Sequence, residues 1–256
     1  MLIINADDFG RSRQETDAAL SCIRRGRVTS VTAMVFMHDS ERAAELANEQ
    51  GAQVGLHLNL SQRFDSSRIQ RALGASHDRI VSFMLSSKYA MLLYNPLLRS
   101  AFRDVFQAQY DEFVRLFGRR PTHIDGHHHR HQCLNMLIGN VIPQGEKVRR
   151  SFSFSNREKN FLNLVYRRFV DHRLSGRYSL TDSFFALSTS LREGSVPKIA
   201  DLARSTDVEL MTHPIQKAEG DYLQGDEFGA LIESMPLGSY ADLRQKRLGH
   251  YPAGPA

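Results

Sequence analysis

Short apolar runs that end in polar residues recur in the first sixty residues of the chain. They span residues 2–5, 28–37 and 54–60, and the second run is rich in β-branched residues. Such runs are typical of central strands in a parallel sheet. Amphipathic segments separate them, one beginning near Ser12 and ending at Gly26, the other covering residues 39–49. Strands and helices that alternate in this way predict an α/β fold built on a parallel sheet or barrel.

Two longer segments interrupt this alternation. Residues 61–100 carry scattered Ser and Arg followed by an apolar stretch, and residues 151–195 are rich in Ser, Phe and Arg without clear periodicity. We expect both to be insertions that shape a substrate cleft. A helix and two further strands are expected over residues 102–117, 123–126 and 208–213. No internal repeat or linker is evident, so a single elaborated domain over residues 1–256 is predicted.

Four of the predicted strands end in reactive polar residues. These are Asp7 with Asp8, His57 with Asn59, Asp125, and His213. Active sites of parallel α/β folds lie at the carboxyl ends of the strands, because the loops that follow the strands converge there. The four strand ends are far apart in the sequence, and a fold of this kind would bring them together. The sequence therefore predicts one site, at the C-terminal ends of the strands.

Imidazole groups are concentrated beside one of these strand ends. Five of the eleven histidines fall within residues 123–131. An expression tag or a metal-scavenging tract is the alternative, but the cluster is internal, contains an aspartate and follows an amphipathic helix. The consecutive side chains of His127, His128 and His129 cannot all face one metal, so we expect one or two ligands here and supporting or substrate contacts from the rest. One aspartate and two histidines would suit Zn²⁺, Mn²⁺ or a similar ion that activates water.

The adjacent carboxylates of Asp7 and Asp8 suit a division of roles. One would bind the metal and the other would act as a base. The alternative is that the two aspartates only stabilise a turn or cap the N-terminus of a helix. Taken alone, His57 would be a structural histidine of a strand. His213 is a candidate general acid, and on local sequence it could equally be a buried histidine. All three assignments depend on the convergence of the strand ends.

Composition and charge narrow the classes of partner. The net charge of +5 and the pI near 9.4 would permit binding to nucleic acid or to an anionic membrane surface. The basic residues are scattered, however, and no nucleic-acid-binding motif accompanies them, so no nucleic-acid partner is predicted. Contact with a membrane surface and a homodimer stay open. No run approaches the roughly 18 to 20 apolar residues of a membrane span. The start resembles a buried strand rather than a signal peptide, and two cysteines form no disulfide framework, so a cytoplasmic location is expected.

Several motifs together resemble the YdjC-like (ChbG/HpnK) family of carbohydrate deacetylases. They are NADDFG at 5–10, GRVTS at 26–30, VGLHL at 54–58, PTHIDGHHHRH at 121–131, MTHP at 211–214 and LGSY at 237–240. They occur in the family's order. The resemblance implies a distorted (β/α) barrel with its active site and a divalent metal at the C-terminal ends of the strands. One departure is Thr16, because family members often have Asn at this position, which puts a local hydrogen bond in doubt.

The resemblance also implies roles for individual residues. Asp8, His57 and His127 would be the metal ligands, with Mg²⁺ or Zn²⁺ as the expected single divalent ion. Asp7 would take a proton from the attacking water, and His213 would stabilise the tetrahedral intermediate or protonate the leaving amine. The remaining expected residues support the site or contact the substrate: Asn59, Asp125, His128, His129, His131 and Arg149.

The expected reaction is therefore metal-dependent removal of an N-acetyl group from an amino sugar. The substrate would be a chito-oligosaccharide or a glycolipid that carries N-acetylglucosamine, such as a hopanoid. The basic surface and the apolar segment from Met84 to Leu98 favour the lipid-linked sugar slightly. The alternatives are another metal-dependent hydrolase on the same scaffold, such as a phosphoesterase, and an inactive sugar-binding module.

Overall fold

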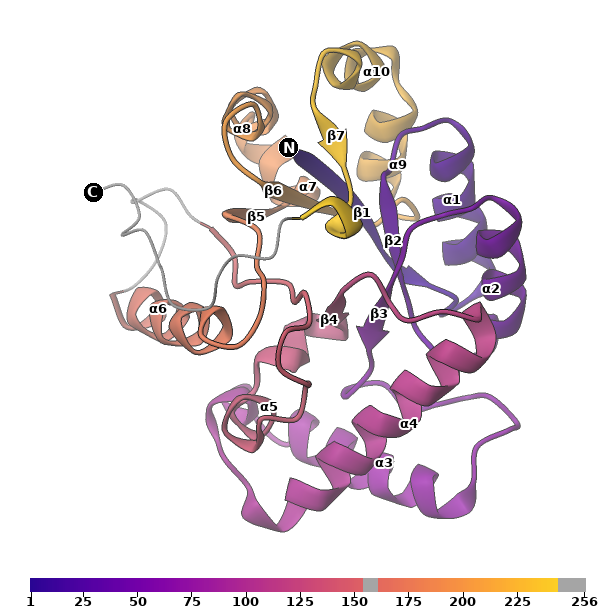
Figure 1. Ribbon diagram of the computed structural model, residues 1–256, viewed down its shortest axis with the longest axis vertical. Helices are drawn as coiled ribbons and strands as arrows, with labels where there is room; N and C mark the ends of the chain where they lie inside the picture. Colours follow the sequence, from indigo (N-terminus) through magenta and orange to yellow (C-terminus); the bar gives the residue numbers. More distant parts are fainter. Residues whose placement is uncertain (154–160, 244–256) are drawn as a thin grey trace.

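The computed structural model describes residues 1–153 and 161–243, and within them seven parallel strands form one curled sheet (Figure 1). The strands are β1 (Leu2–Phe9), β2 (Ser30–Ala33), β3 (Val54–Leu58), β4 (Ile124–Gly126), β5 (Ser183–Ala186), β6 (Val208–Thr212) and β7 (Leu237–Gly238). Their order is β4-β3-β2-β1-β6-β5, and β7 pairs with the first residues of β1. β1 thus lies at the centre, and its C-terminal end is flanked by the C-terminal ends of β2 and β6.

Helices follow most of the strands and surround the sheet. They are α1 (Arg13–Arg24), α2 (Ser40–Glu49), α3 (Arg71–Leu85), α4 (Arg99–Phe117), α5 (Leu134–Gly139), α6 (Phe161–Ser175), α7 (Leu187–Glu193), α8 (Val196–Ala203), α9 (Lys217–Gln224) and α10 (Asp226–Glu233). Short 3₁₀ helices are η1 (Ala90–Leu92), η2 (Pro96–Leu98), η3 (His127–Gln132) and η4 (Tyr240–Asp242). Ser12 caps α1 as expected, and Gly118 ends α4 with a φ of 68°. None of the described helices combines the length and hydropathy that a membrane-spanning helix needs.

The two faces of the sheet carry different kinds of side chain. The outer face, which packs against helices, presents aliphatic residues of the main core: Leu2, Ile4, Ala6, Val31, Ala33, Val54, Leu56, Leu58, Ile124, Val208 and Leu210. The inner face holds buried polar residues: Asn5, Asp7, Ser30, Thr32, His57, Asp125 and Glu209. Side chains alternate along a strand, and the register pairs Asn5 with Ser30 and His57 with Asp125, which keeps these residues on one face. The inside of the curled sheet therefore holds most of the buried polar side chains, together with the apolar Ile3 and Phe184, and the outside is apolar.

Irregular pairings join the two ends of the curled sheet. Val148 forms a parallel bridge with Ile124 of β4, and Lys147 forms another with Ser179, just before β5. Further along, the Ser153 N–H donates to the carbonyl oxygen of Phe184 in β5 at 2.9 Å. The segment that includes residues 147–153 thus bridges β4 and β5 without forming a regular strand. This arrangement confirms the predicted distorted (β/α) barrel.

Two segments differ from the sequence-based expectation. The strand expected over residues 28–37 is limited to β2, and beyond it Phe36 adopts a φ of 59°, outside the extended region. Residues 183–186, expected inside an insertion, form β5 and pair along β6. The sequence Ser-Phe-Phe-Ala is too short and too mixed to stand out as a strand. The other expected insertion, residues 61–100, contains α3, η1 and η2.

Two buried histidines should make the protein sensitive to acid. Burial lowers the pKa of His77 to about 4 and that of His123 to about 3. Histidine in the unfolded chain titrates near pH 6.5. Below that pH the unfolded chain binds protons that the folded protein excludes, so the free energy of unfolding decreases as the pH falls towards the folded-state pKa values of about 4 and about 3. We expect each residue to lower the free energy of unfolding by about 2 kcal/mol at pH 5 relative to pH 8. Urea denaturation at the two pH values measures the difference.

A His77→Gln variant should show a smaller difference between the two pH values than the wild type. The exposed His172 on α6 offers the matched control, since His172→Gln should leave the difference unchanged. A His77→Gln variant whose difference between pH 5 and pH 8 equals that of the wild type would contradict the prediction.

Candidate active site

The end of β1 delivers two adjacent carboxylates to the same place. Asn5 and Asp7 lie on the inner face, so a regular strand would direct Asp8 outward. Instead Asp8 has a φ of 64°, in the left-handed region, and the pairing of β1 with β2 is irregular between Ala6 and Phe9. Strained backbone of this kind persists where the surrounding structure enforces it, often at functional sites. The turn allows both Asp7 and Asp8 to reach the polar interior.

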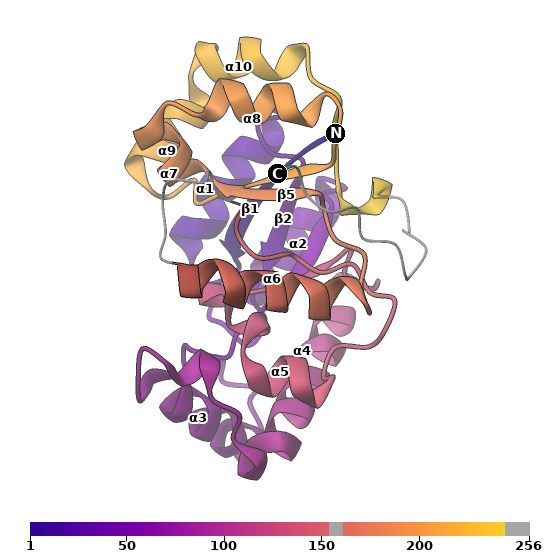
Figure 2. The same ribbon diagram turned by 90° about the vertical axis from the view of Figure 1, so that its left-hand side faces the viewer.

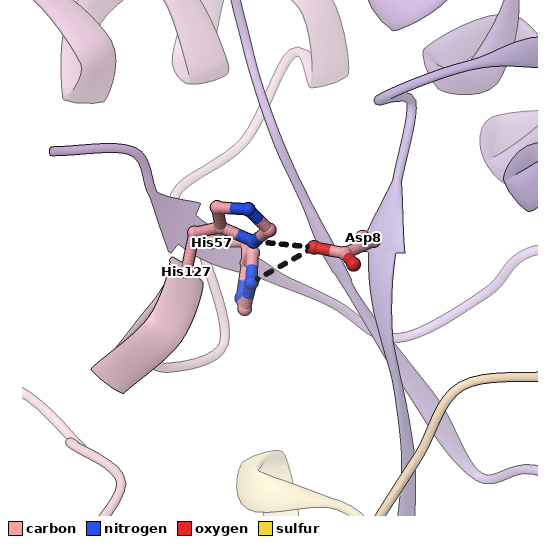
Figure 3. Close-up of side chains that lie close together, drawn as sticks. All are labelled: Asp8, His57 and His127. Carbon is pink, nitrogen blue, oxygen red and sulfur yellow. Dashed lines mark ion pairs between the residues drawn. The ribbon is translucent and has the colours of Figure 1, made fainter. Parts of the chain in front are cut away.

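Asp8, His57 and His127 meet in a compact buried cluster (Figure 3). Asp8 Oδ1 lies 3.2 Å from His57 Nε2 and 2.8 Å from His127 Nδ1. His57 belongs to β3, and His127 follows β4 directly, so three strand ends supply the three side chains. All three residues are buried, and one ligand atom of each lies within 4.8 Å of the others. The structure thus brings together the three residues that the resemblance implied as metal ligands.

The cluster meets a simple test for a cation site. His57 Nδ1 donates to Asp125 Oδ1 at 2.7 Å, so in its neutral tautomer the Nε2 lone pair faces Asp8. Asp8 Oδ1 is buried and has no hydrogen-bond donor in good geometry, although two ring nitrogens approach it. Burial opposes protonation of His57, but the carboxylates of Asp125 and Asp7 more than offset it and raise its pKa to about 10. The centre of the cluster therefore favours positive charge, which a divalent ion would supply.

Arg149 connects the second carboxylate of β1 to two further acids. Its side chain is completely buried, and Nη1 and Nη2 donate to the two oxygens of Asp7 at 2.7 Å each. Nη2 also lies 2.7 Å from Asp125 Oδ2, and Nε donates to Glu209 Oε1 at 2.9 Å. Burial acts to raise the pKa of Asp7, but Arg149 outweighs it and lowers that pKa below its ordinary value. Asp7 is therefore held ionised in a fixed orientation.

Glu209 and Tyr240 belong to this network but were not predicted as site residues. Glu209 is fully buried on β6, where burial raises its pKa to about 6, and Tyr240 Oη donates to its Oε2 at 2.5 Å. One signal in the sequence could have identified Glu209, because a lone carboxylate inside the apolar strand Val208–Thr212 requires a buried partner. Tyr240 ends the LGSY motif at 237–240, but the motif alone does not indicate a partner that lies 31 positions away.

The other histidines of the cluster have separate contacts. His128 Nδ1 lies 3.1 Å from Ser61 Oγ, and its ring packs on that of His127 with centroids 3.9 Å apart. His131 is buried, and its Nε2 donates to the carbonyl oxygen of Arg149 at 3.1 Å. The backbone at His128 and at His129 is left-handed, with φ values of 51° and 56°. Two such residues in succession direct consecutive rings to different places, which explains why only His127 joins Asp8.

His129 and Asn59 lie at the margin of the cluster. The His129 ring contacts Phe152 and Phe184 edge-on, and burial lowers its pKa well below the ordinary value. Asn59 does not contact the acidic groups; its amide donates to the carbonyl oxygen of Gln62 at 2.7 Å and its Oδ1 accepts from the Gln62 N–H at 2.9 Å. Asn59 therefore shapes the loop that leaves β3.

His213 extends β6 beside Asp7. Ala6 of β1 pairs with Thr212 of β6, so the next residues on these neighbouring strands are Asp7 and His213. The His213 side chain is 24% exposed, Nδ1 lies 3.9 Å from Glu219 Oε1, and the backbone N–H donates to Glu219 Oε2 at 2.6 Å. Among the described residues Nδ1 has no hydrogen-bond partner. His213 is thus a partly exposed residue next to Asp7, with its buried Nδ1 directed towards Glu219.

Thr16 supplies the local hydrogen bond that the sequence put in doubt. Its hydroxyl accepts from the Gly10 N–H at 3.2 Å and donates to the carbonyl oxygen of Ser12 at 3.0 Å. Gly10 has a φ of 84°, which favours glycine. The turn after Asp8 is therefore held by a threonine in this chain.

Comparison with known proteins identifies relatives of this chain. The YdjC-like protein family matches residues 1–234. The chitooligosaccharide deacetylase of Proteus mirabilis is 39% identical over 132 residues, which cover 51% of this chain and 50% of that protein. The chitooligosaccharide deacetylase of Escherichia fergusonii is 34% identical over 156 residues, which cover 58% of each. The matched region thus spans about half the length of these curated relatives.

A solved structure shares the fold. The crystal structure of an Enterococcus faecalis V583 protein described as a candidate cellobiose-phosphate cleavage protein aligns with a TM-score of 0.69 at 22% identity, covering 94% of this chain and 98% of that one. Similarity at this level of identity concerns the fold alone. The match to the family over residues 1–234 includes every residue of the Asp8–His57–His127 cluster and of the Arg149 network except Tyr240. The chain belongs to the YdjC-like family.

Proposed function

We propose that this protein is a metal-dependent hydrolase that removes the N-acetyl group from an N-acetylated amino sugar. The observation that carries the proposal is the pairing of two adjacent carboxylates with different partners. Asp8 meets two imidazoles, while Asp7 is held by Arg149. One carboxylate is thereby suited to bind a metal and the other to accept a proton. The names of the curated relatives support an amide of an amino sugar as the bond that is cleaved.

Asp8, His57 and His127 would hold the metal. Two imidazoles and one carboxylate form a donor set that Zn²⁺ accepts more readily than Mg²⁺, which prefers oxygen ligands. When bound, such an ion lowers the pKa of a water ligand and polarises a carbonyl oxygen. Asp125 supports this ligand set because it fixes the tautomer of His57, and Arg149 in turn holds Asp125.

Asp7 would serve as the general base. Its Oδ1 already accepts hydrogen bonds from Arg149, from Asn5 at 2.9 Å and from Thr32 at 3.2 Å. Its Oδ2 accepts from Arg149 alone among the described residues, so one lone pair stays available for the proton of the attacking water. As that proton moves to Asp7, the water oxygen bonds to the acetyl carbon.

His213 would complete the reaction as the general acid. It enters the site from β6, next to Asp7 but on a different strand. Transfer of a proton from its ring to the amide nitrogen lets the C–N bond break, so that acetate and a free amine leave together. His213 must be protonated at the start of this step, whereas Asp7 must be ionised. The accessible ring of His213 suits contact with a leaving group that departs toward solvent.

A phosphoesterase is the second candidate, and the carboxylates argue against it. Two-metal phosphatases need a second cation site a few ångströms from the first. The other close groupings among the described residues are Asp7–His57–Asp125 and His123–Asp125–Glu209. Both contain carboxylates that are already paired with the buried guanidinium of Arg149. These groupings are therefore better explained as a network that surrounds an arginine.

Acetate release tests the proposal directly. We expect the metal-loaded protein to release acetate from at least one member of a panel of chito-oligosaccharides and N-acetylglucosamine-bearing glycolipids, and to release no phosphate from phosphorylated sugars. An Asp7→Asn variant should lose about 10²- to 10⁴-fold in rate, the range that general-base catalysis contributes, while its metal content stays the same. Phosphate release without acetate release would replace the proposed reaction with the second candidate. Absence of both activities, with metal bound, would favour a binding module.

A further inference from the structure

A group of large apolar side chains is exposed on the segment between α3 and α4. The group consists of Leu85, Tyr89, Leu92, Leu93 and Leu97, with exposed fractions of 62%, 57%, 43%, 51% and 80%. We call it the apolar tip. Single exposed apolar residues are ordinary on protein surfaces, but five of them within thirteen positions form a patch, and such patches mark interaction sites.

The apolar tip is held by ordered contacts. Met84, Ala90 and Leu98 are buried and attach the segment to the core. The Asn95 N–H donates to Asn135 Oδ1 at 3.0 Å, and Asn135 Nδ2 donates back to the carbonyl oxygen of Asn95 at 2.8 Å. The exposed side chains are therefore presented by a fixed backbone, which lowers the entropy cost of binding a partner.

Basic residues outnumber acidic ones around the apolar tip, and the acidic residues nearest to it in the sequence are Asp78 and Asp104. Residues 79–103 contain no Asp or Glu and four basic residues, all of them exposed. They are Arg79, Lys88, Arg99 and Arg103. The Lys88 ammonium lies over the Tyr89 ring, 5.0 Å from its centroid. Protein surfaces that bind membranes commonly combine tyrosine, leucine and basic side chains.

The apolar tip lies on the same side of the barrel as the candidate active site. The chain passes from the C-terminal end of β3 into α3, and His77 of α3 bonds to the carbonyl oxygen of Asn59 at 3.0 Å, two residues after His57. In both views α3 lies at the end of the molecule opposite α8 and α10 (Figures 1 and 2). The apolar tip therefore follows a helix that packs at the C-terminal end of β3, the end of the sheet that carries the candidate active site.

We propose that the apolar tip docks on an anionic lipid surface. Its leucines and Tyr89 enter the boundary of the headgroups and acyl chains, and Lys88 and Arg99 contact the lipid phosphates. A second copy of the chain is a poorer occupant, because two such patches would oppose their basic residues across the interface, where like charges disfavour association. Lipid binding through these residues does not depend on deacetylase activity.

Vesicle co-sedimentation tests the docking proposal. The probes are phosphatidylcholine vesicles with and without about 30% phosphatidylglycerol. We expect the full chain to bind the anionic vesicles, and the Leu93→Ser/Leu97→Ser double variant to bind them at least about tenfold more weakly. Lys88→Gln and Arg99→Gln should each weaken binding by about fivefold, and added salt should weaken it further. The matched control is Leu202→Ser/Leu237→Ser, which alters two leucines that are 37% and 39% exposed away from the apolar tip.

Thermal unfolding shows whether each variant is folded, independently of any activity. Weakened binding by the tip variant, with wild-type unfolding and unchanged binding by the control, would support docking. Equal binding by the tip variant and the control would overturn it, as would no binding of the wild type to either vesicle. A concentration-dependent dimer that the tip substitutions abolish, without vesicle binding, would overturn it in favour of a second copy.

Discussion

An Asp8→Ala protein should lose its bound metal and about 10³-fold or more of its deacetylase activity. Asp8 supplies the carboxylate of the proposed ligand set and lies within 3.2 Å of both imidazoles. Changes to groups that merely orient metal ligands already cost about 10- to 100-fold in affinity or activity, so loss of a ligand should cost more. A factor of 10³ corresponds to about 4 kcal/mol of transition-state stabilisation. Metal content by mass spectrometry and acetate release measure the two effects.

Asp8→Asn is the companion variant, because asparagine tolerates the left-handed backbone at this position and keeps the shape of the side chain. It should fold as the wild type does and still bind the metal weakly, because its neutral carbonyl is a poorer ligand. The exposed Asp221, which pairs with Lys217 on α9, offers the control: Asp221→Ala should change neither metal content nor activity. Full activity and full metal content in Asp8→Ala would refute the ligand assignment.

Arg149→Met should lower the free energy of unfolding by about 3 to 5 kcal/mol or more. Arg149 is fully buried and pairs with Asp7, Asp125 and Glu209, so its removal leaves three carboxylates buried without their cation. Removal of one partner from a buried ion pair costs this much because the remaining charge stays desolvated. Arg115→Met is the control, since Arg115 pairs with Glu112 and Glu41 on the surface and should contribute no more than about 1 kcal/mol.

The stability deficit of the Arg149→Met variant relative to the wild type should depend on pH. Without the guanidinium, burial acts to raise the folded-state pKa of Asp7 and Glu209 above their unfolded values, whereas Asp125 keeps its hydrogen bond with His57. The contribution of Asp7 and Glu209 to stability is then present at a pH below their unfolded pKa. It is lost as the pH rises through their folded-state pKa. We therefore expect the deficit relative to wild type to shrink between pH 8 and pH 5. Adding Glu209→Gln to Arg149→Met should also reduce the deficit in the free energy of unfolding. A deficit that changes neither with pH nor with Glu209→Gln would contradict the electrostatic explanation.

The two predictions are linked through Asp125. One oxygen of Asp125 accepts from His57, and the other lies against Arg149. The metal cluster and the base of the proposed reaction therefore share one carboxylate, and a change on one side should affect the other. This sharing offers a physical reason for the supporting role that the resemblance implied for Arg149.

The pattern of the sequence was sufficient to locate the strand ends that carry polar residues. Asp7, Asp8, His57 and Asp125 each follow or end a short apolar run, and parallel strands place such residues at one edge. The fold class and the family are confirmed, and the roles of the individual residues stay predictions. β5 was not recognised as a strand, because four residues with two phenylalanines carry no periodic signal.

The polar interior of the barrel depended on the tertiary structure. His57 matched no simple buried face in the sequence, because both faces of the sheet are buried and the inner one is polar. One buried network joins Arg149, Glu209 and Tyr240, although these residues are far apart in the sequence. Local sequence encodes which strands form, because that depends on near neighbours. Which buried charges meet is decided only when the sheet curls and water is excluded, since desolvation then makes an unpaired charge costly.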